Sequence, residues 1–581
     1  MHLLDYSIII IYFLISIAIG IYYSKRASKG TSEFFLSGRN LPWWLAGTSM
    51  VATTFAADTP LAVTELVAQH GIAGNWLWWN FVFGGVLTIF FFAKLWRRAG
   101  VMTDVEFIEL RYSGKPAAFL RGFRALYLGL FLNCIIMGWV NVAMMSILEG
   151  IFGISHSQVI LYIAACMVLV AAYSAMSGLW GVAATDVFQF VFAMVGTIVL
   201  AILLLNLPQV GGIAGLQQKL PKDFFNFFPS VESNLEGFKN LQGLATSFSL
   251  SVTGFLAYIG IQWWASWYPG AEPGGGGYVA QRMMAAKDER HSVLATLWFT
   301  VAHYCLRPWP WILTGLATLV LYPQLSLADK KLGYVFAMRD YLPTGLLGML
   351  VAAFFAAYMS TIATHLNWGT SYVVNDFYRR FVKKDAEEKE YVRVSRITTI
   401  LLMLVSVVLT IFIQTISGAW MFIIEAGAGL GLVLILRWYW WRVNAWSEIA
   451  AMLTPFFAYG YIKFLTDVTF PNSLFFIVGV TTVVWLVVTF LTKPTDENVL
   501  KEFYTRIRPG GMWKPIAKIL PNVKTDFNFG KQMLQWLAGV VLVYSSLFGM
   551  GKFLLGEMVL GLALLLVAVV CGGLLWRMMR E

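Results

Sequence analysis

The chain has 581 residues, of which 59% are hydrophobic and only 13% are charged, whereas about 25% of the residues of a typical soluble domain are charged. Its mean hydropathy is +0.69. This composition excludes an ordinary soluble enzyme and predicts a protein built from membrane-spanning helices. The net charge of +11 needs no nucleic acid partner, because Lys and Arg are enriched in the cytoplasmic loops of membrane proteins.

Segments of about 20 apolar residues can cross the bilayer as helices, and about 15 such segments follow one another along the chain. They run from 4 to 23, 43 to 69, 76 to 93, 125 to 149, 158 to 176, 183 to 205, 244 to 266, 292 to 321, 345 to 375, 397 to 415, 418 to 436, 447 to 465, 474 to 492, 532 to 549 and 556 to 576. Positive charge follows the first segment, so we expect a retained anchor and not a cleaved signal peptide. With the N-terminus outside and the C-terminus cytoplasmic, most Lys and Arg residues fall in inside loops. The sequence therefore predicts a multi-pass protein of the cell membrane, plasma or inner.

Two of the predicted spans contain residues that interrupt helices. The second contains Asp58, Pro60 and Glu65, and Pro60 removes a helical hydrogen bond. The seventh runs into residues 262–282, which contain two prolines and a run of glycines. Non-helical backbone at membrane depth is tolerated where it lines a cavity, so paired breaks predict a binding site. Because the breaks lie five spans apart, we expect two inverted five-helix repeats.

We assign the first repeat to residues 42–206 and the second to residues 244–440. The additions are an N-terminal helix with a cytoplasmic loop (1–41), an extracellular loop (207–243), two further helices (441–492), a basic cytoplasmic linker (493–531) and two C-terminal helices (532–581). Phe503 and Trp513 in the linker fit a segment lying on the anionic inner leaflet, and a solvated connection fits equally well. The four cysteines show no metal-binding spacing, and we expect them to be core residues.

The ninth predicted span carries hydroxyl groups in an apolar helix. Ala357, Ser360 and Thr361 stand at i, i+3 and i+4, so they share one face. Oxygen atoms are the ligands that a hard cation such as sodium prefers. Small and hydroxyl residues also let membrane helices pack closely. The spacing alone leaves both readings open, a sodium site and a packing contact.

Four stretches resemble successive landmarks of the sodium:solute symporter family, which includes sodium/proline, sodium/glucose-type and sialic acid transporters. They are FFLSGRNLPWWLAGTSMVA (34 to 52), SGLWGVAATDVFQ (177 to 189), VAQRMMAAK (279 to 287) and AAYMSTIATHLN (356 to 367). The resemblance covers residues 1 to 490 and implies the inverted five-plus-five repeat of a leucine-transporter-like fold. It also implies a sodium site made of the carbonyls of Ala52 and Phe55 with Ala357, Ser360 and Thr361.

The resemblance further implies a second sodium site or a release path. Asp186 matches an aspartate with that role in relatives, and Thr364 matches one hydroxyl of the second site. Ala363 stands where those relatives have serine, which leaves the number of sodium ions open. An intramembrane carboxylate is functional by default, although Asp186 could instead cap the start of the sixth span.

Candidate solute contacts come from the two broken spans and their neighbours. They are Thr54, Asp58, Thr59, Trp78, Phe81, Gln262, Trp264, His303 and Arg307. His303 stands where sugar-carrying relatives have a lysine, and Arg307 follows at i+4. Two cations favour an anionic or zwitterionic solute, because Arg binds carboxylates through paired hydrogen bonds. Alternatively, Arg307 pairs structurally with Asp58, Glu272 or a carbonyl. Trp78 and Phe81 replace polar groups of sugar-carrying relatives, which weakens the alternative of a sodium/sugar symporter.

These features predict a sodium-coupled secondary active symporter that imports a small organic solute by alternating access. A membrane-embedded enzyme is disfavoured, because the six histidines are scattered and no HExxH motif is present. A receptor on the transporter fold is a further alternative. His365, one turn after Thr361, is either a proton-sensitive neighbour of the sodium site or a hydrogen-bonded core residue. The sequence leaves the oligomeric state open, a monomer included.

Overall fold

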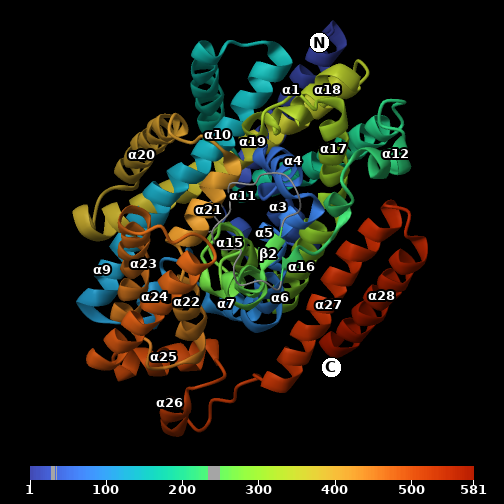
Figure 1. Ribbon diagram of the computed structural model, residues 1–581. Coiled ribbons are helices and arrows are strands. Elements are labelled where there is room, and N and C mark those ends of the chain that lie inside the picture. The colour runs from blue at the N-terminus through green and yellow to red at the C-terminus, as the bar shows by residue number, and fades with distance from the viewer. Residues whose placement is uncertain (28–32, 34–35, 233–248, 581) are drawn as a thin grey trace.

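The computed structural model describes residues 1–27, 33, 36–232 and 249–580 (Figure 1). The boundary predicted at 243/244 and part of the first family landmark lie outside these residues. The described chain is helical except for loops and one pair of three-residue strands, β1 (Ser230–Glu232) and β2 (Ser249–Ser251), which run parallel.

The helices are labelled α, and short 3₁₀ or π-helical turns are labelled η. In the first half they are α1 (Leu3–Ala27), η1 (Ser37–Arg39), α3 (Trp43–Thr53), α4 (Asp58–His70), η2 (Ile72–Asn75), α5 (Trp76–Trp79), α6 (Val82–Leu87), η3 (Thr88–Phe92), α7 (Ala93–Ala99), α8 (Phe107–Arg111), α9 (Gly114–Leu126), η4 (Tyr127–Leu132), α10 (Asn133–Phe152), α11 (His156–Leu205), α12 (Gly212–Lys219) and η5 (Lys222–Phe225). In the second half they are α13 (Val252–Leu256), η7 (Ala257–Gln262), α14 (Trp263–Ala265), α15 (Gly277–Ala285), α16 (Glu289–Val301), η8 (Ala302–Leu306), α17 (Pro308–Leu321), η9 (Leu327–Asp329), α18 (Leu332–Tyr341), α19 (Leu346–Ser371), η10 (Tyr372–Val382), α20 (Glu388–Thr410), α21 (Ile416–Ala426), α22 (Leu430–Tyr439), α23 (Ala445–Leu465), α24 (Asn472–Leu491), α25 (Glu497–Ile507), α26 (Lys514–Ile519), α27 (Phe529–Leu554) and α28 (Met558–Arg580).

Among the described residues, 9 helices are individually long and apolar enough to cross a membrane, or 10 if the bent pair α21 and α22 forms one span. Several predicted spans are divided into shorter helices and so fall below that length. The predicted spans 158 to 176 and 183 to 205 both lie in α11, which has 50 residues. A polytopic, all-helical architecture is therefore confirmed, whereas the number of about 15 spans stays a prediction.

Both predicted breaks are present, and the first lies earlier than its proline suggests. α3 ends at Thr53 and α4 begins at Asp58, with a non-helical segment between them. Pro60 lies in the first turn of α4, where the N–H that proline lacks would have no helical partner anyway. The chain therefore leaves the helix before Pro60 and not at it.

The second break is an extended segment between Ala265, where α14 ends, and Gly277, where α15 begins. Gly270, Gly274 and Gly275 adopt φ values of 81°, 79° and 80° in this segment. L-residues with a side chain rarely adopt this left-handed conformation, which explains the glycine run. In Figure 1, α3 and α15 lie near the centre of the molecule, surrounded by other helices.

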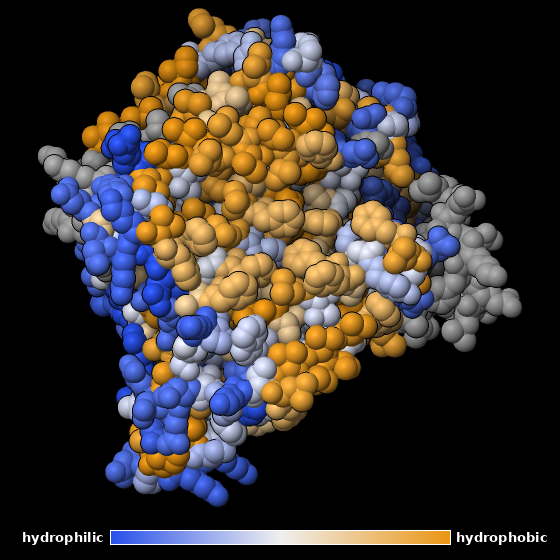
Figure 2. All heavy atoms as spheres, turned by 90° about the vertical axis from the view of Figure 1, so that its left-hand side faces the viewer, coloured by the Kyte–Doolittle hydropathy of each residue, from blue (hydrophilic) through white to orange (hydrophobic). Residues whose placement is uncertain are grey.

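The outer surface of the molecule carries the apolar side chains that a bilayer requires. Figure 2 shows the side formed by helices such as α20, α23 and α24, with hydrophobic residues over a broad area and hydrophilic ones toward its margins. Leu401, Phe464 and Leu491 are among the exposed large residues of these helices. Soluble monomers rarely expose continuous apolar patches larger than a few hundred Å², so this surface fits contact with lipid.

The basic linker, residues 493–531, is folded against the rest of the protein. In α25 the side chains of Phe503 and Ile507 are buried, and the rings of Phe503 and Trp513 stack at 5.4 Å between centroids. Asp526 accepts hydrogen bonds from Arg98 in α7 at 2.9 and 2.6 Å. These aromatic residues therefore pack inside the protein and are not free to enter the inner leaflet.

Candidate functional site

A cavity of about 80 Å³, here called the central cavity, is lined by residues of both helix breaks. Its lining residues are Thr53, Thr54, Ala56, Asp58, Thr59, Trp78, Phe81, Ile136, Trp139, Val140, Tyr268, Pro269, Gly270, Ala271, Tyr278, His303, Tyr304, Thr361, His365 and Trp420. One buried water needs about 10–15 Å³, so the cavity has room for a small solute.

Six of the nine predicted solute contacts line this cavity: Thr54, Asp58, Thr59, Trp78, Phe81 and His303. Gln262 and Trp264 do not. The Gln262 side chain is buried and donates to the carbonyl of Leu77 at 3.1 Å, and the Trp264 indole donates to the carbonyl of Gly260 at 2.6 Å. Both residues precede the second break, and their side chains bond to backbone carbonyls outside the cavity lining.

Arg307 holds the first break in place from behind the cavity wall. Its guanidinium donates to the carbonyl of Val51 at 3.1 Å, and to the hydroxyl and carbonyl of Thr54 at 2.7 and 2.8 Å. It also lies 2.9 Å from Nδ1 of His303. An arginine nitrogen can only donate, so this Nδ1 accepts and the His303 ring is neutral. The expected pair of cations facing the cavity is therefore not present, and the structural alternative for Arg307 agrees with these contacts.

Asp58 is the charged group that does line the central cavity. Its side chain is only 3% exposed, and its Oδ1 atom has no hydrogen-bond partner among the described residues. No described residue forms an ion pair with it within 4.0 Å. Burial of an unpaired carboxylate is costly, so its position calls for a functional explanation.

Aromatic rings form much of the remaining wall, and most of them were not among the predicted contacts. Trp139 comes from α10, Tyr268 from the second break and Trp420 from α21. Tyr268 stacks on Phe81 at 5.3 Å and meets Trp420 edge-on at 6.0 Å between ring centroids. Tryptophans are common throughout this sequence, so without the fold nothing distinguishes these from packing residues.

Two of the predicted sodium ligands, Ser360 and Thr361, contact Asp186 and the last turn of α3. Ser360 donates to Oδ1 of Asp186 at 2.7 Å, and Ser49 donates to Oδ2 of the same carboxylate at 2.6 Å. Thr361 donates to the carbonyl of Thr53 at 3.4 Å. Ala52, Phe55 and Ala357 are all buried. Asp186 lies far inside α11, which begins at His156, so the helix-capping alternative is wrong.

Arg282 is a part of this cluster that the sequence reasoning missed. It is 1% exposed, and its guanidinium donates to the Ser49 hydroxyl at 3.3 Å and to the Thr53 hydroxyl at 3.4 Å. A buried arginine beside the Asp186 carboxylate balances its charge. Arg282 lies within VAQRMMAAK, the third stretch that resembles the family, and that position could have marked it as a candidate site residue.

Thr364 and His365 take different places on α19. The Thr364 hydroxyl is buried and has no hydrogen-bond partner among the described residues, which neither supports nor excludes a second ion. His365 lines the central cavity, and its Nδ1 lies 2.6 Å from the side-chain oxygen of Asn133. That oxygen can only accept, so Nδ1 carries the proton and Nε2 is left as an acceptor.

A second cavity of about 250 Å³ lies beside the loop between α7 and α9, on the side that the charge pattern assigns to the cytoplasm. Its lining residues are Met102, Thr103, Asp104, Glu106, Arg121, Gly277, Gln281, Met284, Trp368, Ser371, Tyr372, Asn375, Asp376 and Arg379. Tyr278, His365 and Trp368 lie between the two cavities, with ring centroids 6.2 and 5.7 Å apart in turn.

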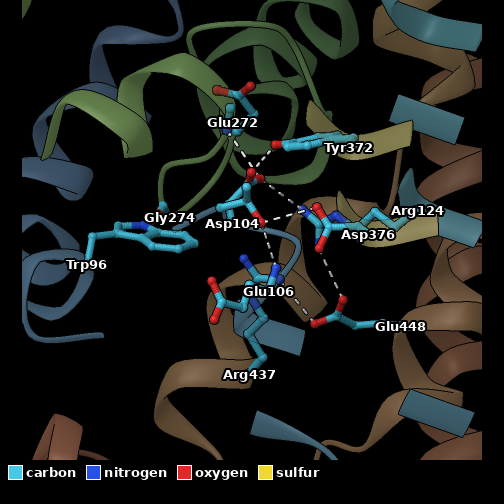
Figure 3. A network of polar contacts seen from close by, with 12 residues as sticks. Trp96, Asp104, Glu106, Arg124, Glu272, Gly274, Tyr372, Asp376, Arg437 and Glu448 are labelled. Atoms are coloured by element: carbon cyan, nitrogen blue, oxygen red, sulfur yellow. Dashed lines mark hydrogen bonds and ion pairs between the residues drawn. The ribbon is translucent and has the colours of Figure 1, made fainter. Parts of the chain in front are cut away.

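Figure 3 shows a network of polar contacts beside the second cavity, in which Asp104, Arg124, Tyr372 and Asp376 take part. Asp376 pairs with Arg121 at 2.5 Å, and Asp104 accepts from Tyr372 and lies 3.9 Å from Arg124. Deeper in the protein, Glu448 pairs with both Arg124 and Arg437 at 3.3 Å. The network links η10, α9, α22 and α23, so it fastens several helices to one another around this cavity.

The chain matches the model of the sodium:solute symporter family over residues 34–454. It is 25% identical to the sodium/myo-inositol cotransporter 2 of Oryctolagus cuniculus, over 80% of this chain and 70% of that protein. It is 24% identical to the sodium/glucose cotransporter of Vibrio parahaemolyticus, over 85% of this chain and 92% of that protein.

Among solved structures, the chain resembles a Na⁺-coupled sialic acid symporter in a substrate-bound outward-open state. The TM-score is 0.65 at 20% sequence identity, and the match covers 85% of this chain and 99% of that one. This likeness shows a shared fold, the predicted leucine-transporter-like one. The relatives are transporters, which confirms that the chain is not an enzyme. Because the family model matches most of its length, the chain belongs to the sodium:solute symporter family.

Proposed function

We propose that the protein imports a small organic solute together with sodium, by alternating access around the central cavity. One observation carries this proposal. Ser360 and Thr361 reach from α19 to Asp186 in α11 and to the open end of α3, where the helix breaks. Such a cluster of hydroxyl, carbonyl and carboxylate oxygens at a broken helix suits a hard monovalent cation.

The proposed sodium ligands are the carbonyls of Ala52, Phe55 and Ala357 with the hydroxyls of Ser360 and Thr361. Sodium bound there would join α19 to the broken helix and favour the outward-open state. A sodium ion that moves inward through about 100 mV releases roughly 2.3 kcal/mol, before any concentration gradient is counted. The Asp186 carboxylate would attract the sodium ion, and the Arg282 guanidinium would offset part of that negative charge. We also place Asp186 on the path by which the ion leaves.

The number of sodium ions is a separate part of the proposal. We place one ion at the site above and keep Thr364 as a conditional ligand of a second. A cavity of about 10 Å³ beside Ala363 is lined by Tyr12, Ser16 and Thr185, among others. Ser360 lines this cavity and Thr364 does not, so the cavity lies beside the first proposed site.

The membrane topology is also proposed and not shown. We place the N-terminus outside and the C-terminus in the cytoplasm, with inverted repeats at 42–206 and 244–440. The second cavity would then be the cytoplasmic vestibule, separated from the central cavity by Tyr278, His365 and Trp368. The ion pairs around it would have to rearrange when the solute leaves.

A sodium/sugar symporter is the second candidate, because two of the relatives are named for glucose and myo-inositol. Sugars need many hydrogen-bond partners. Thr54, Thr59 and Tyr278 in the lining could supply some of them, whereas the rings of Trp78, Phe81, Trp139 and Trp420 cover much of the rest of the wall. An anionic solute would face the Asp58 carboxylate, so a zwitterionic solute fits the cavity better than an anionic one.

Uptake into proteoliposomes tests the proposed function. The vesicles contain purified protein, and sugars, amino acids, organic acids, vitamins and amines are offered with an inward sodium gradient or an equal potassium gradient. We expect at least one class to accumulate in sodium only. Accumulation that is equal in both gradients would contradict sodium coupling, and uptake that survives Ser360→Ala with Thr361→Ala would contradict the assigned site. Thr370→Ala, on the same helix, is the control because its hydroxyl pairs with Thr399 and lies outside the cluster.

A further inference from the structure

We propose that the central cavity binds a positively charged, methylated ammonium group of the solute, with Asp58 as its counter-charge and the surrounding rings as its walls. The inference rests on the proposed function and names the chemical class of the solute. It begins from Asp58, which is 97% buried, lines the cavity and has an oxygen without a hydrogen-bond partner among the described residues.

The cationic groups near the cavity are already engaged elsewhere. Arg307 donates to Val51 and Thr54 and does not line the cavity. His303 is neutral, because its Nδ1 accepts from Arg307. Arg282 donates to Ser49 and Thr53 on the Asp186 side of α3. Among the described residues Asp58 therefore has no direct ion-pair partner, although the charge of Arg307 acts on it from outside the cavity lining, and a ligand cation could supply that partner.

The sodium site has its own counter-charge. Asp186 bonds directly to Ser360, one of the proposed ligands, so an ion at that cluster does not need Asp58. Asp58 lies on the other side of the break, in the first turn of α4. Of the two carboxylates on opposite sides of the break, Asp186 already has the Arg282 guanidinium beside it, so Asp58 is the one left to pair with a second cation.

The walls beside Asp58 suit a cation without hydrogen-bond donors. A cation within about 6 Å of a ring centroid is attracted by the face of that ring, most strongly by tryptophan. Trp78, Trp139, Tyr268 and Trp420 all line the cavity with Asp58. A primary ammonium has three N–H groups that each need an acceptor, whereas a methylated nitrogen is satisfied by aromatic faces and one carboxylate.

A pair of matched probes separates charge from shape. Choline carries a trimethylammonium group, and 3,3-dimethyl-1-butanol has the same shape with a neutral carbon in place of nitrogen. Each is added to purified protein in sodium or in potassium, and the melting temperature and the dissociation constant are measured. Ligand binding to the folded state raises the melting temperature by mass action. We expect choline to bind and the neutral isostere to bind at least about 30-fold more weakly, as the loss of one partner of a buried charge pair implies.

Variants then assign the effect to residues. Asp58→Asn should weaken choline binding at least about 30-fold while leaving the response to sodium alone unchanged. Trp420→Leu should weaken it about 3- to 30-fold, and Trp420→Phe by less, because a ring face is kept. Thr370→Ala should change neither response. Melting of each variant without ligand shows whether it folds.

Several outcomes would overturn the inference. Equal binding of the two probes, or no binding of choline and of other methylated amines such as glycine betaine, would exclude an ammonium site. Loss of the sodium response in Asp58→Asn without any amine would make Asp58 a sodium ligand. A failure of the proposed function would give a different result from a failure of this inference. Choline would still bind, but with the same affinity in sodium and in potassium, and it would not accumulate in vesicles.

Discussion

Asp376, which lines the second cavity, pairs with an arginine, whereas Asp58, which lines the central cavity, pairs with none among the described residues. Asp376 pairs with Arg121, and Glu448 lies between two arginines that are themselves buried. Asp58 is equally buried and has no such partner among the described residues. The two cavities therefore differ in whether their buried carboxylates already form ion pairs within the protein.

This difference indicates which of the two carboxylates, Asp376 or Asp58, a charged ligand can pair with. A satisfied buried ion pair holds helices in a fixed arrangement, and removing one partner leaves the other charge unbalanced. Asp58 holds no arginine in place, so a ligand that supplies the opposite charge can pair with it without breaking an existing ion pair. This comparison agrees with the proposal that the solute binds in the central cavity and that the ion pairs beside the second cavity hold the helices there together.

We expect the largest loss of folding stability from Glu448→Gln. If Glu448 and Asp58 played the same role, Asp58→Asn would cause an equal loss. Glu448→Gln leaves Arg124 and Arg437 without their shared counter-charge and should cost about 3–5 kcal/mol of folding stability. Thermal unfolding in detergent measures it. Asp58→Asn is the matched control and should leave the melting temperature unchanged or raise it. Equal destabilisation by both changes would show that Asp58 has a structural partner after all.

A smaller effect should appear only in sodium. Wild-type protein at a sodium concentration 100 times the dissociation constant should gain about 2.7 kcal/mol of stability over the same protein in potassium. Ser360→Ala with Thr361→Ala should remove this gain, because two of the proposed ligands are lost. The Glu448→Gln protein, if it folds, should keep it. A gain that survives in the double alanine variant would place the ion elsewhere.

We expect the smallest loss of stability from breaking the ion pair between Arg98 and Asp526. The Asp526 side chain is largely exposed, unlike the carboxylates discussed above. The hydrogen bond from Arg98 holds the pKa of Asp526 below its ordinary value of 3.8. The pair therefore stabilises the folded protein above pH 4, and this contribution is lost as the pH falls through the lowered pKa. Since the Asp526 side chain is 55% exposed, Asp526→Asn should cost under about 1 kcal/mol at neutral pH. In thermal unfolding the effect of Asp526→Asn should be smaller at pH 3 than at neutral pH, and high salt should reduce it.

The sequence could predict the cluster of hydroxyls that we propose as the sodium site, because its signal is local. The hydroxyls of Ser360 and Thr361 are neighbours on one helical face, and the four landmarks placed them within the family. It misplaced the first break, because Pro60 is the visible helix breaker while the chain actually departs from the helix at Thr54, where Arg307 holds the carbonyl. That contact joins residues 253 positions apart and cannot be seen in a local pattern.

The solute cavity was predicted less completely for the same reason. Trp139 and Trp420 come from helices far apart in the sequence and meet only once the helices pack. Gln262 and Trp264 were chosen for their nearness to the second break, but their side chains bond to backbone carbonyls outside the cavity lining. The charge of the cavity was also misjudged, because the bonds that occupy Arg307 and neutralise His303 depend on three-dimensional contacts.

The break at residues 54–57 lies between the proposed sodium site and the proposed solute site, so one short piece of backbone contacts both. Its α3 side carries the carbonyl that Thr361 contacts, and its α4 side begins with Asp58. If each ligand binds more tightly once the other has fixed this segment, the same coupling free energy must act in both directions. The factor by which sodium raises the affinity for the solute must then equal the factor by which the solute raises the affinity for sodium.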